Sequence, residues 1–194
     1  MYESNRSFYS VVVTLSCLIV LSVVLVTRPL SVQAREIAVT ADETKLRAAI
    51  VLGILRFSSW PNDVSMAATF NLCTLGAPTS KSTLVKISGQ REYKDKPILT
   101  IVLKGNSPDI STCNAIVIGP QAKKRALSKL LNSKSAFGVL TICDNCQPED
   151  TKAMVYMLRK KNRVGFEVDL IHAEKNGMTF SSSLLELAID VKQD

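Results

Sequence analysis

The N-terminal segment constrains this chain more than any other part, because it decides the compartment in which the rest must fold. From Phe8 to Val26 no residue carries a charge, and Arg6 precedes this run. The pattern is typical of an export signal, and Val32-Gln33-Ala34 places small residues where a signal peptidase requires them. We therefore expect a signal peptide over residues 1–34. An uncleaved membrane anchor is the alternative, because the run approaches the length of a spanning helix.

The remaining sequence predicts one exported domain. A short leader over residues 35–41 should precede a single domain over residues 42–194, and the periplasm is the expected location. The chain is 46% apolar and 21% charged, which suits a globular domain and excludes disorder. Removing residues 1–34 takes two basic and one acidic residue from totals of 24 and 17, which leaves a net charge of +6. An exported basic chain meets anionic membrane surfaces and acidic protein faces, so we expect no nucleic-acid partner.

Export also changes what the cysteines mean. Four remain in the mature chain, Cys73, Cys113, Cys143 and Cys146, an even number in an oxidising compartment. We predict that Cys73 pairs with Cys113, because both lie in apolar segments expected to be neighbouring strand ends. Cys143 should then pair with Cys146 across a tight turn.

The Cys143-Asp144-Asn145-Cys146 motif has two further interpretations. In a thiol oxidoreductase the local charge must stabilise a thiolate, whereas Asp144 and the nearby Glu149 would raise the thiol pKa. A zinc site would need a second paired motif, and Cys73 and Cys113 stand alone. A structural disulfide is the favoured interpretation.

The sequence contains few of the residues that usually act as catalytic groups or metal ligands. The chain contains one histidine, His172, so a multi-histidine metal site is excluded, and a Ser-His or Cys-His pair could form in only one place. A hydrolase mechanism is therefore a weak expectation, and the sequence predicts no catalytic residue, no metal and no cofactor.

Helix and strand signals alternate along the domain. A capping box at Thr40–Glu43 predicts a helix that carries Leu46, Ile50, Ile54 and Phe57 on its buried face and ends at Trp60. A second box at Ser183–Glu186 predicts a closing helix. The other expected elements are strands at 69–75, 97–103, 113–118 and 137–142, an antiparallel pair at 153–158 and 164–170, and helices at 79–87 and after Gly119-Pro120.

This order predicts an α/β fold, a three-layer sandwich whose central sheet is mixed and partly parallel. The layers are Rossmann-like, but the sequence contains neither of the glycine-rich phosphate-binding fingerprints.

Several segments taken together resemble a known family. They are Ile54–Pro61, Phe70–Gly76, Cys113–Ile118, the stretch 162–170 and the stretch 176–188. In this order, with a signal peptide and two cysteine pairs, they are similar to the YfiR-like periplasmic regulators from about Lys45 to Ala188.

The resemblance implies a regulatory, non-enzymatic role. Understood members bind the periplasmic domain of an inner-membrane diguanylate cyclase and hold it inactive, which lowers cyclic-di-GMP and thereby bears on biofilm formation. The resemblance also implies homodimerisation, sequestration by an outer-membrane lipoprotein, and the same two cysteine pairs.

Two aromatic residues and one methionine are candidates for the partner contact. Trp60, next to Pro61, is the first, and Met178 and Phe180 after the Asn176-Gly177 turn form a second patch, although packing in the core would explain all three. The alternative function is a small-ligand-binding sensor domain that acts on another membrane partner, with its pocket at the carboxyl ends of the parallel strands.

Overall fold

The computed structural model describes residues 31–61, 67–104, 109–131, 136–146, 151–161 and 163–193. The chain divides into two compact units, Met1–Thr40 and Ala41–Asp194. No helix within the described ranges is long and apolar enough to cross a membrane. The predicted signal peptide lies almost entirely outside those ranges, so its cleavage after Ala34 and the leader over 35–41 stay predictions.

Helices and strands alternate through the domain much as the sequence predicts. In chain order the elements are α2 (Ser31–Arg56), β1 (Ser58–Ser59), β2 (Phe70–Leu75), α3 (Lys81–Lys86), β3 (Glu92–Tyr93), β4 (Lys96–Val102), β5 (Ala115–Ile118), α4 (Lys124–Leu131), β6 (Leu140–Asp144), β7 (Val155–Lys160), β8 (Arg163–Asp169), α5 (Leu170–Lys175), β9 (Thr179–Phe180), α6 (Ser182–Leu187) and β10 (Asp190–Lys192).

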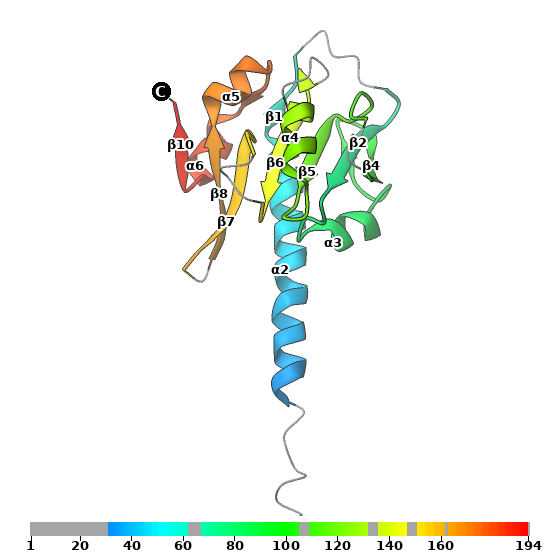
Figure 1. The fold of residues 1–194 in the computed structure, drawn as a ribbon, viewed down its shortest axis with the longest axis vertical. Coiled ribbons are helices and arrows are strands. Elements are labelled where there is room, and N and C mark those ends of the chain that lie inside the picture. Colours follow the sequence, from blue (N-terminus) through cyan, green and yellow to red (C-terminus); the bar gives the residue numbers. More distant parts are fainter. Residues whose placement is uncertain are drawn as a thin grey trace, which may run out of the picture. The chain divides into compact units, whose positions relative to one another are not determined.

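Eight strands form one mixed sheet in the order β10-β8-β7-β6-β5-β2-β4-β3 (Figure 1). The strands from β4 through β2, β5 and β6 to β7 are parallel. Antiparallel pairs occur towards both edges, where β8 returns along β7 and β3 pairs with β4. The predicted antiparallel pairing of the two late strands is confirmed. β1 and β9 form a separate two-stranded sheet.

Two apolar clusters cover the two faces of the sheet, because successive side chains of a strand point to opposite faces. In β2, Phe70 and Leu72 belong to one cluster while Cys73 and Leu75 belong to the other. The first cluster also contains residues of α2, α3, α5 and α6. The second contains Leu127 and two further leucines of α4. The predicted three-layer α/β sandwich with a mixed sheet is confirmed.

Some predicted element boundaries are wrong. The capping box at Thr40 does not start a helix, because α2 is already helical from Ser31 and no glycine or proline lies between Ser31 and Thr40. Its end also comes earlier than Trp60, because Ser58–Ser59 pairs with β9 instead of continuing the helix. At the closing helix, Ser181 is the N-cap, and its hydroxyl accepts a hydrogen bond from the Leu184 amide.

Candidate partner-binding face

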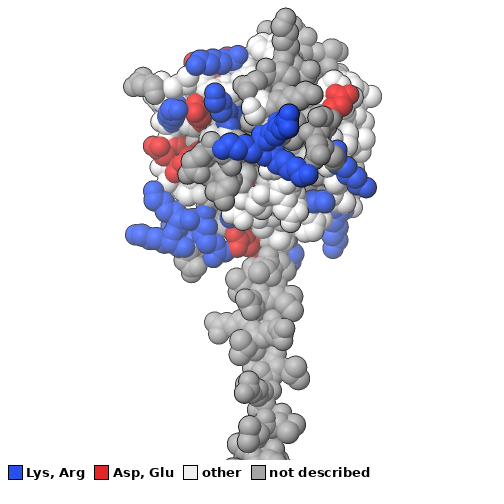
Figure 2. All heavy atoms as spheres, viewed as in Figure 1, with Lys and Arg blue, Asp and Glu red and all other residues white. Residues whose placement is uncertain are grey.

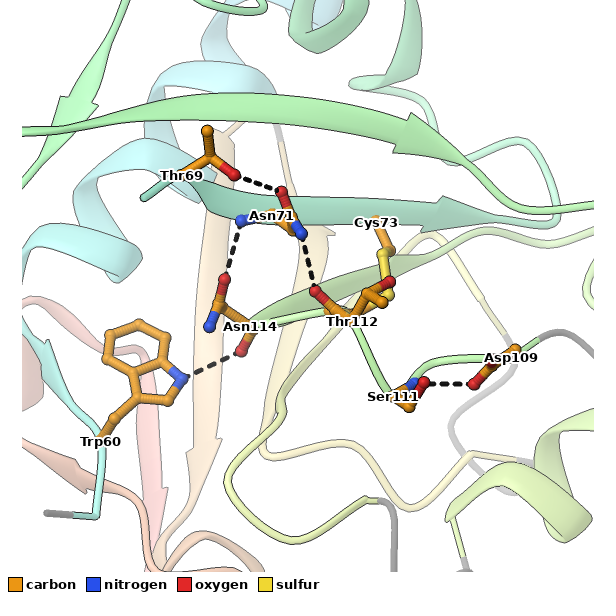
Figure 3. The surroundings of a disulfide bond; sticks show 9 residues. Trp60, Thr69, Asn71, Cys73, Asp109, Ser111, Thr112 and Asn114 are labelled. Atoms are coloured by element: carbon orange, nitrogen blue, oxygen red, sulfur yellow. Dashed lines mark hydrogen bonds between the residues drawn. A yellow bond between two sulfur atoms is a disulfide. The ribbon is translucent and has the colours of Figure 1, made fainter. Parts of the chain in front are cut away.

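Trp60 lies in the core at the amino ends of the parallel strands. Its side chain is 9% exposed, and its indole Nε1 donates a hydrogen bond of 2.9 Å to the carbonyl of Asn114 (Figure 3). The ring packs edge-on against Phe70 at 5.2 Å and Tyr93 at 5.0 Å between centroids. A buried indole needs such a partner for its N–H group. Packing therefore explains this tryptophan, and a partner would meet the surface above it rather than the ring.

A polar network fixes the strand ends beside Trp60 (Figure 3). The Asn114 side-chain oxygen accepts a hydrogen bond of 2.8 Å from the Asn71 amide, and the Asn71 side chain donates to the Thr112 carbonyl at 2.9 Å. The Cys73–Cys113 disulfide lies next to this network, because Cys73 is two positions after Asn71 and Cys113 directly precedes Asn114. It joins β2 to the residues before β5. Both predicted pairs, this one and Cys143–Cys146, are confirmed.

The other two predicted contact residues lie at the same end of the molecule. Met178 is fully buried, so its side chain is not presented to a partner in this conformation. Phe180 belongs to β9, pairs with Ser58 of β1, and is partly buried against the core. The fold therefore brings Trp60, Met178 and Phe180 into one region, with two of the three beneath its surface. Whether any of them contacts a partner stays a prediction.

Exposed aromatic side chains lie in this region as well. Phe137 is 47% exposed and Phe57 is 36% exposed. Phe137 and Pro61 both border Gly177, where an added Cβ would come within 2.8 Å of the Phe137 ring and 3.0 Å of the Pro61 ring. The Phe57 carbonyl accepts a hydrogen bond from Ser181, next to Phe180. We call Phe57, Pro61, Phe137 and Phe180 the aromatic end.

Sequence reasoning assigned both exposed phenylalanines to buried elements. Phe137 was expected to start a strand, but β6 begins only at Leu140, because Gly138 has a positive φ of 71° that a strand does not accommodate. The sequence predicts Phe57 on the buried face of the first helix, but α2 ends at Arg56. The glycine that directly follows Phe137 is the sequence signal that could have shown that the strand does not begin there.

The opposite edge of the sheet, at the carboxyl ends of the parallel strands, contains a buried ionic cluster. Asp144 at the end of β6 is fully buried and Arg47 of α2 is 3% exposed. Arg47 donates a hydrogen bond of 2.8 Å to Oδ1 of Asp144, and the amide and hydroxyl of Ser80 both donate to Oδ2 at 2.7 Å. Protein donors thus occupy both carboxyl oxygens, so Asp144 is not presented to a metal ion or a substrate.

Glu43 extends this cluster towards the surface. It accepts a hydrogen bond of 2.8 Å from Nε of Arg47 and forms an ion pair with Arg159 of β7. Burial by itself would raise the pKa of Glu43, but the hydrogen bonds and charges of Arg47 and Arg159 outweigh it and hold that pKa below its ordinary value. The cluster therefore links α2 to two strands of the sheet.

The crevice in which open α/β sheets bind ligands is filled here. Such ligands bind where neighbouring strand connections diverge, which in this sheet is at the ends of β2 and β5. The loops after these strands are joined by hydrogen bonds of 2.8 Å from Gly119 to Leu75 and from Gln121 to Gly76. A Cβ on Gly119 would lie 2.2 Å from the Pro78 nitrogen. The two loops therefore pack backbone against backbone and leave no room for a ligand between them, while a ligand pocket at the carboxyl ends of the strands stays a prediction.

A hollow of about 350 Å³ lies elsewhere, between the end of α2 and the strands β3 and β4. Its apolar lining includes Leu52, Leu55 and Ile98, and basic side chains are present as Arg56, Arg91 and Lys94.

Comparison with known proteins identifies the family. The YfiR/HmsC-like family matches residues 44–189, which covers the sheet except its last strand and all the helices apart from the first part of α2. The chain therefore belongs to this family, whose members are periplasmic regulators of diguanylate cyclase signalling rather than enzymes. No curated protein matches the sequence.

Proposed function

We propose that this protein is exported to the periplasm, binds the periplasmic domain of an inner-membrane diguanylate cyclase, and holds that enzyme inactive, which lowers cyclic-di-GMP. The family match over residues 44–189 is the observation that carries the proposal. Two disulfides suit an oxidising compartment, and the uncharged run from Phe8 to Val26 suits export.

We assign the contact with the cyclase to the aromatic end. Protein interfaces concentrate binding energy in a few aromatic side chains, and Phe137 and Phe57 are exposed there. Trp60 and Met178 would support the contact indirectly. They pack in the core and so hold in place the segments that carry Pro61 and Phe180. The interior network around Asn114 makes this end rigid, which lowers the entropy lost on binding.

The test compares cells that lack the gene with cells that regain it. Deletion should raise cyclic-di-GMP, and the wild-type chain should lower it again. Phe137→Ser should fail to restore the low level and should weaken co-purification of the cyclase by roughly 30-fold, because truncation of a central aromatic contact typically costs about 2 kcal/mol. Equal cyclic-di-GMP in wild-type and deletion cells would refute the proposed function.

The matched control is Leu187→Ser on α6. Leu187 is 68% exposed, so its loss removes a comparable apolar group from the surface without touching the aromatic end. It should restore low cyclic-di-GMP. Thermal unfolding of both variants must match the wild type, so that loss of binding is not loss of folding. If both variants behave alike, the contact lies elsewhere on the domain.

Two further partners follow from the same proposal. The regulator should form a homodimer, and an outer-membrane lipoprotein should sequester it and so release the cyclase. Light scattering of the purified protein tests the first, and co-purification from outer-membrane extracts tests the second. A monomer at micromolar concentration would contradict the dimer.

The hollow beside α2 favours a second candidate function, a sensor for a small amphipathic anion. An apolar floor with basic side chains at its border suits such a ligand. The fluorescent probe 8-anilinonaphthalene-1-sulfonate should bind to the folded protein, and replacing both Arg91 and Lys94 with Gln should weaken that binding. Unchanged affinity would exclude the hollow as its site.

A further inference from the structure

The tip of the β7–β8 hairpin gathers four basic side chains within five positions of the chain. β7 ends with Arg159 and Lys160, β8 begins with Arg163, and Lys161 lies between them with a positive φ of 56° that marks the turn. All four residues are exposed. In Figure 2, blue side chains gather at the place where Figure 1 shows the tip of this hairpin. We call these four residues the basic tip.

The charges of the basic tip are only partly neutralised by the protein itself. Arg159 forms an ion pair with Glu43. Within the described part of the chain, Lys160, Lys161 and Arg163 form no ion pair. Like charges held on adjoining positions of a hairpin repel each other. Binding of an external anion would relieve this repulsion. Because the basic tip projects from the domain and encloses no space, it suits an extended anionic surface better than a small ligand.

The position of the basic tip suggests which anionic surface this is. The ion pair between Arg159 and Glu43 holds the hairpin beside the first residues of the domain. Only the fourteen residues from 27 to 40 separate the domain from the apolar run that ends at Val26. Fully extended, they span at most about 50 Å. While the apolar run is still attached, before cleavage or in the membrane-anchored alternative, this side of the domain therefore stays within that distance of the inner membrane.

We propose that the basic tip binds the anionic phospholipid headgroups of the inner-membrane surface. Clusters of four or more Lys and Arg residues are attracted to anionic bilayers, and arginine and lysine both bind phosphate oxygens. The hairpin lies at the carboxyl ends of the parallel strands, whereas the aromatic end lies at their amino ends. Binding through the basic tip thus leaves the aromatic end free to contact a protein partner.

The test footprints lysines in the full chain with vesicles. The chain is acetylated with and without vesicles of phosphatidylethanolamine and phosphatidylglycerol, and with neutral phosphatidylcholine vesicles. Lys160 and Lys161 should be acetylated at least about fivefold more slowly with the anionic vesicles only, and high salt should abolish that protection. Lys94, in the turn after β3 and therefore at the edge of the sheet remote from β7 and β8, should react equally in all samples. The footprint reports local contact even where the apolar run itself inserts into both kinds of vesicle.

Matched variants complete the test. Replacing Lys160 and Lys161 with Gln should lower the affinity for anionic vesicles by roughly 30-fold, about fivefold for each cation removed. Replacing Lys152 and Lys175, which are exposed and lie outside the basic tip, with Gln removes the same charge elsewhere and should have little effect. Equal protection by neutral and anionic vesicles, or an equal loss in the two variants, would overturn the proposal. Because the vesicles contain no protein, the outcome is independent of cyclase binding.

Discussion

At the scale of single residues, Arg47 of α2 and Asp144 of β6 form an ion pair inside the domain, with 2.8 Å between Nη1 and Oδ1. Both side chains are almost fully buried and both are satisfied by hydrogen bonds. A buried ion pair contributes little net stability compared with apolar residues of the same volume, but removing one partner leaves the other charge buried without compensation.

Asp144→Ala should therefore lower the free energy of unfolding by about 3–5 kcal/mol. Denaturant unfolding of the oxidised protein measures this. The matched control is Asp42→Ala, since Asp42 pairs with Lys45 at the surface, where the two side chains are 82% and 71% exposed. That change should cost less than about 1 kcal/mol. Similar effects of the two substitutions would show that leaving Arg47 without its buried partner carries no extra cost in stability.

His172 predicts a pH dependence that can be assigned without ambiguity, because the chain contains one histidine. Burial lowers the pKa of His172 below its ordinary value of about 6.5, and the charges of Lys152 and Lys175 lower it further. The charge of Asp169 and a backbone hydrogen bond to Lys152 oppose this shift. Between the folded pKa and about 6.5 the unfolded chain binds more protons than the folded one. Stability should thus fall as the pH is lowered through this window and change no further from this source below it. His172→Gln should flatten the dependence of Tm on pH between about pH 7 and pH 5, and an unchanged slope would assign it to other groups.

The sequence alone predicts which cysteines pair, but it does not show which of the candidate contact residues are buried. The sequence correctly paired all four cysteines, since apolar strand ends and an even count leave few arrangements. It could not tell whether Trp60 was exposed, because that depends on Asn114, a residue distant in sequence that accepts its hydrogen bond. The Arg47–Asp144 pair was missed for the same reason, although Arg47 shares a helix face with Val51 and Ile54 and so signalled a buried cation.

At the scale of elements, replacing each of two glycines with alanine should change the stability of the domain in opposite directions. A Cβ at Gly119 would collide with the backbone of residues 76–78, and backbone cannot move aside as a side chain can. Gly53 in α2 has no atom within 4 Å of the same position. Gly119→Ala should therefore destabilise the domain by about 3 kcal/mol, whereas Gly53→Ala should stabilise it by about 0.5–1 kcal/mol through helix propensity. Thermal and denaturant unfolding distinguish these signs, and a neutral Gly119→Ala would mean that the two loops separate easily.

Long elements were predictable and short ones were not. The strands β2, β4, β5 and β6 come from short segments rich in apolar residues, which local composition reveals. The two-residue strands β1, β3 and β9 exist only through pairing with distant segments, and no local pattern encodes them. In α2 the period was right but the phase was only partly right. Leu46 was expected inside and is 48% exposed, and Ala48 and Val51 are buried, whereas Ile54 is buried as the sequence predicts.

At the scale of the whole molecule, the two edges of the sheet have different roles in our proposals. The amino ends carry the aromatic end, which we assign to a protein partner, and the carboxyl ends carry the buried ionic cluster and the basic tip. Each edge also has its own disulfide: Cys73–Cys113 lies beside the Asn71–Asn114 network, and Cys143–Cys146 adjoins Asp144.

The two disulfides should differ in their contribution to the stability of the whole molecule. Cys73 and Cys113 are 40 positions apart, and Cys143 and Cys146 are three apart. If restriction of the unfolded chain dominates, replacing the first pair with Ser should cost about 4 kcal/mol and the second about 2 kcal/mol. Denaturant unfolding of the two double variants measures both.

The reverse order would have a definite physical meaning. Cys143–Cys146 closes the turn directly after the buried Asp144, so losing it could displace the carboxyl group from Arg47 and Ser80. A larger cost for the shorter loop would therefore locate its contribution in the native ionic cluster rather than in the unfolded chain. Combining Cys143→Ser and Cys146→Ser with Asp144→Ala separates the two causes. The costs add if the disulfide acts on the unfolded chain, and they fall short of additivity if it acts through Asp144.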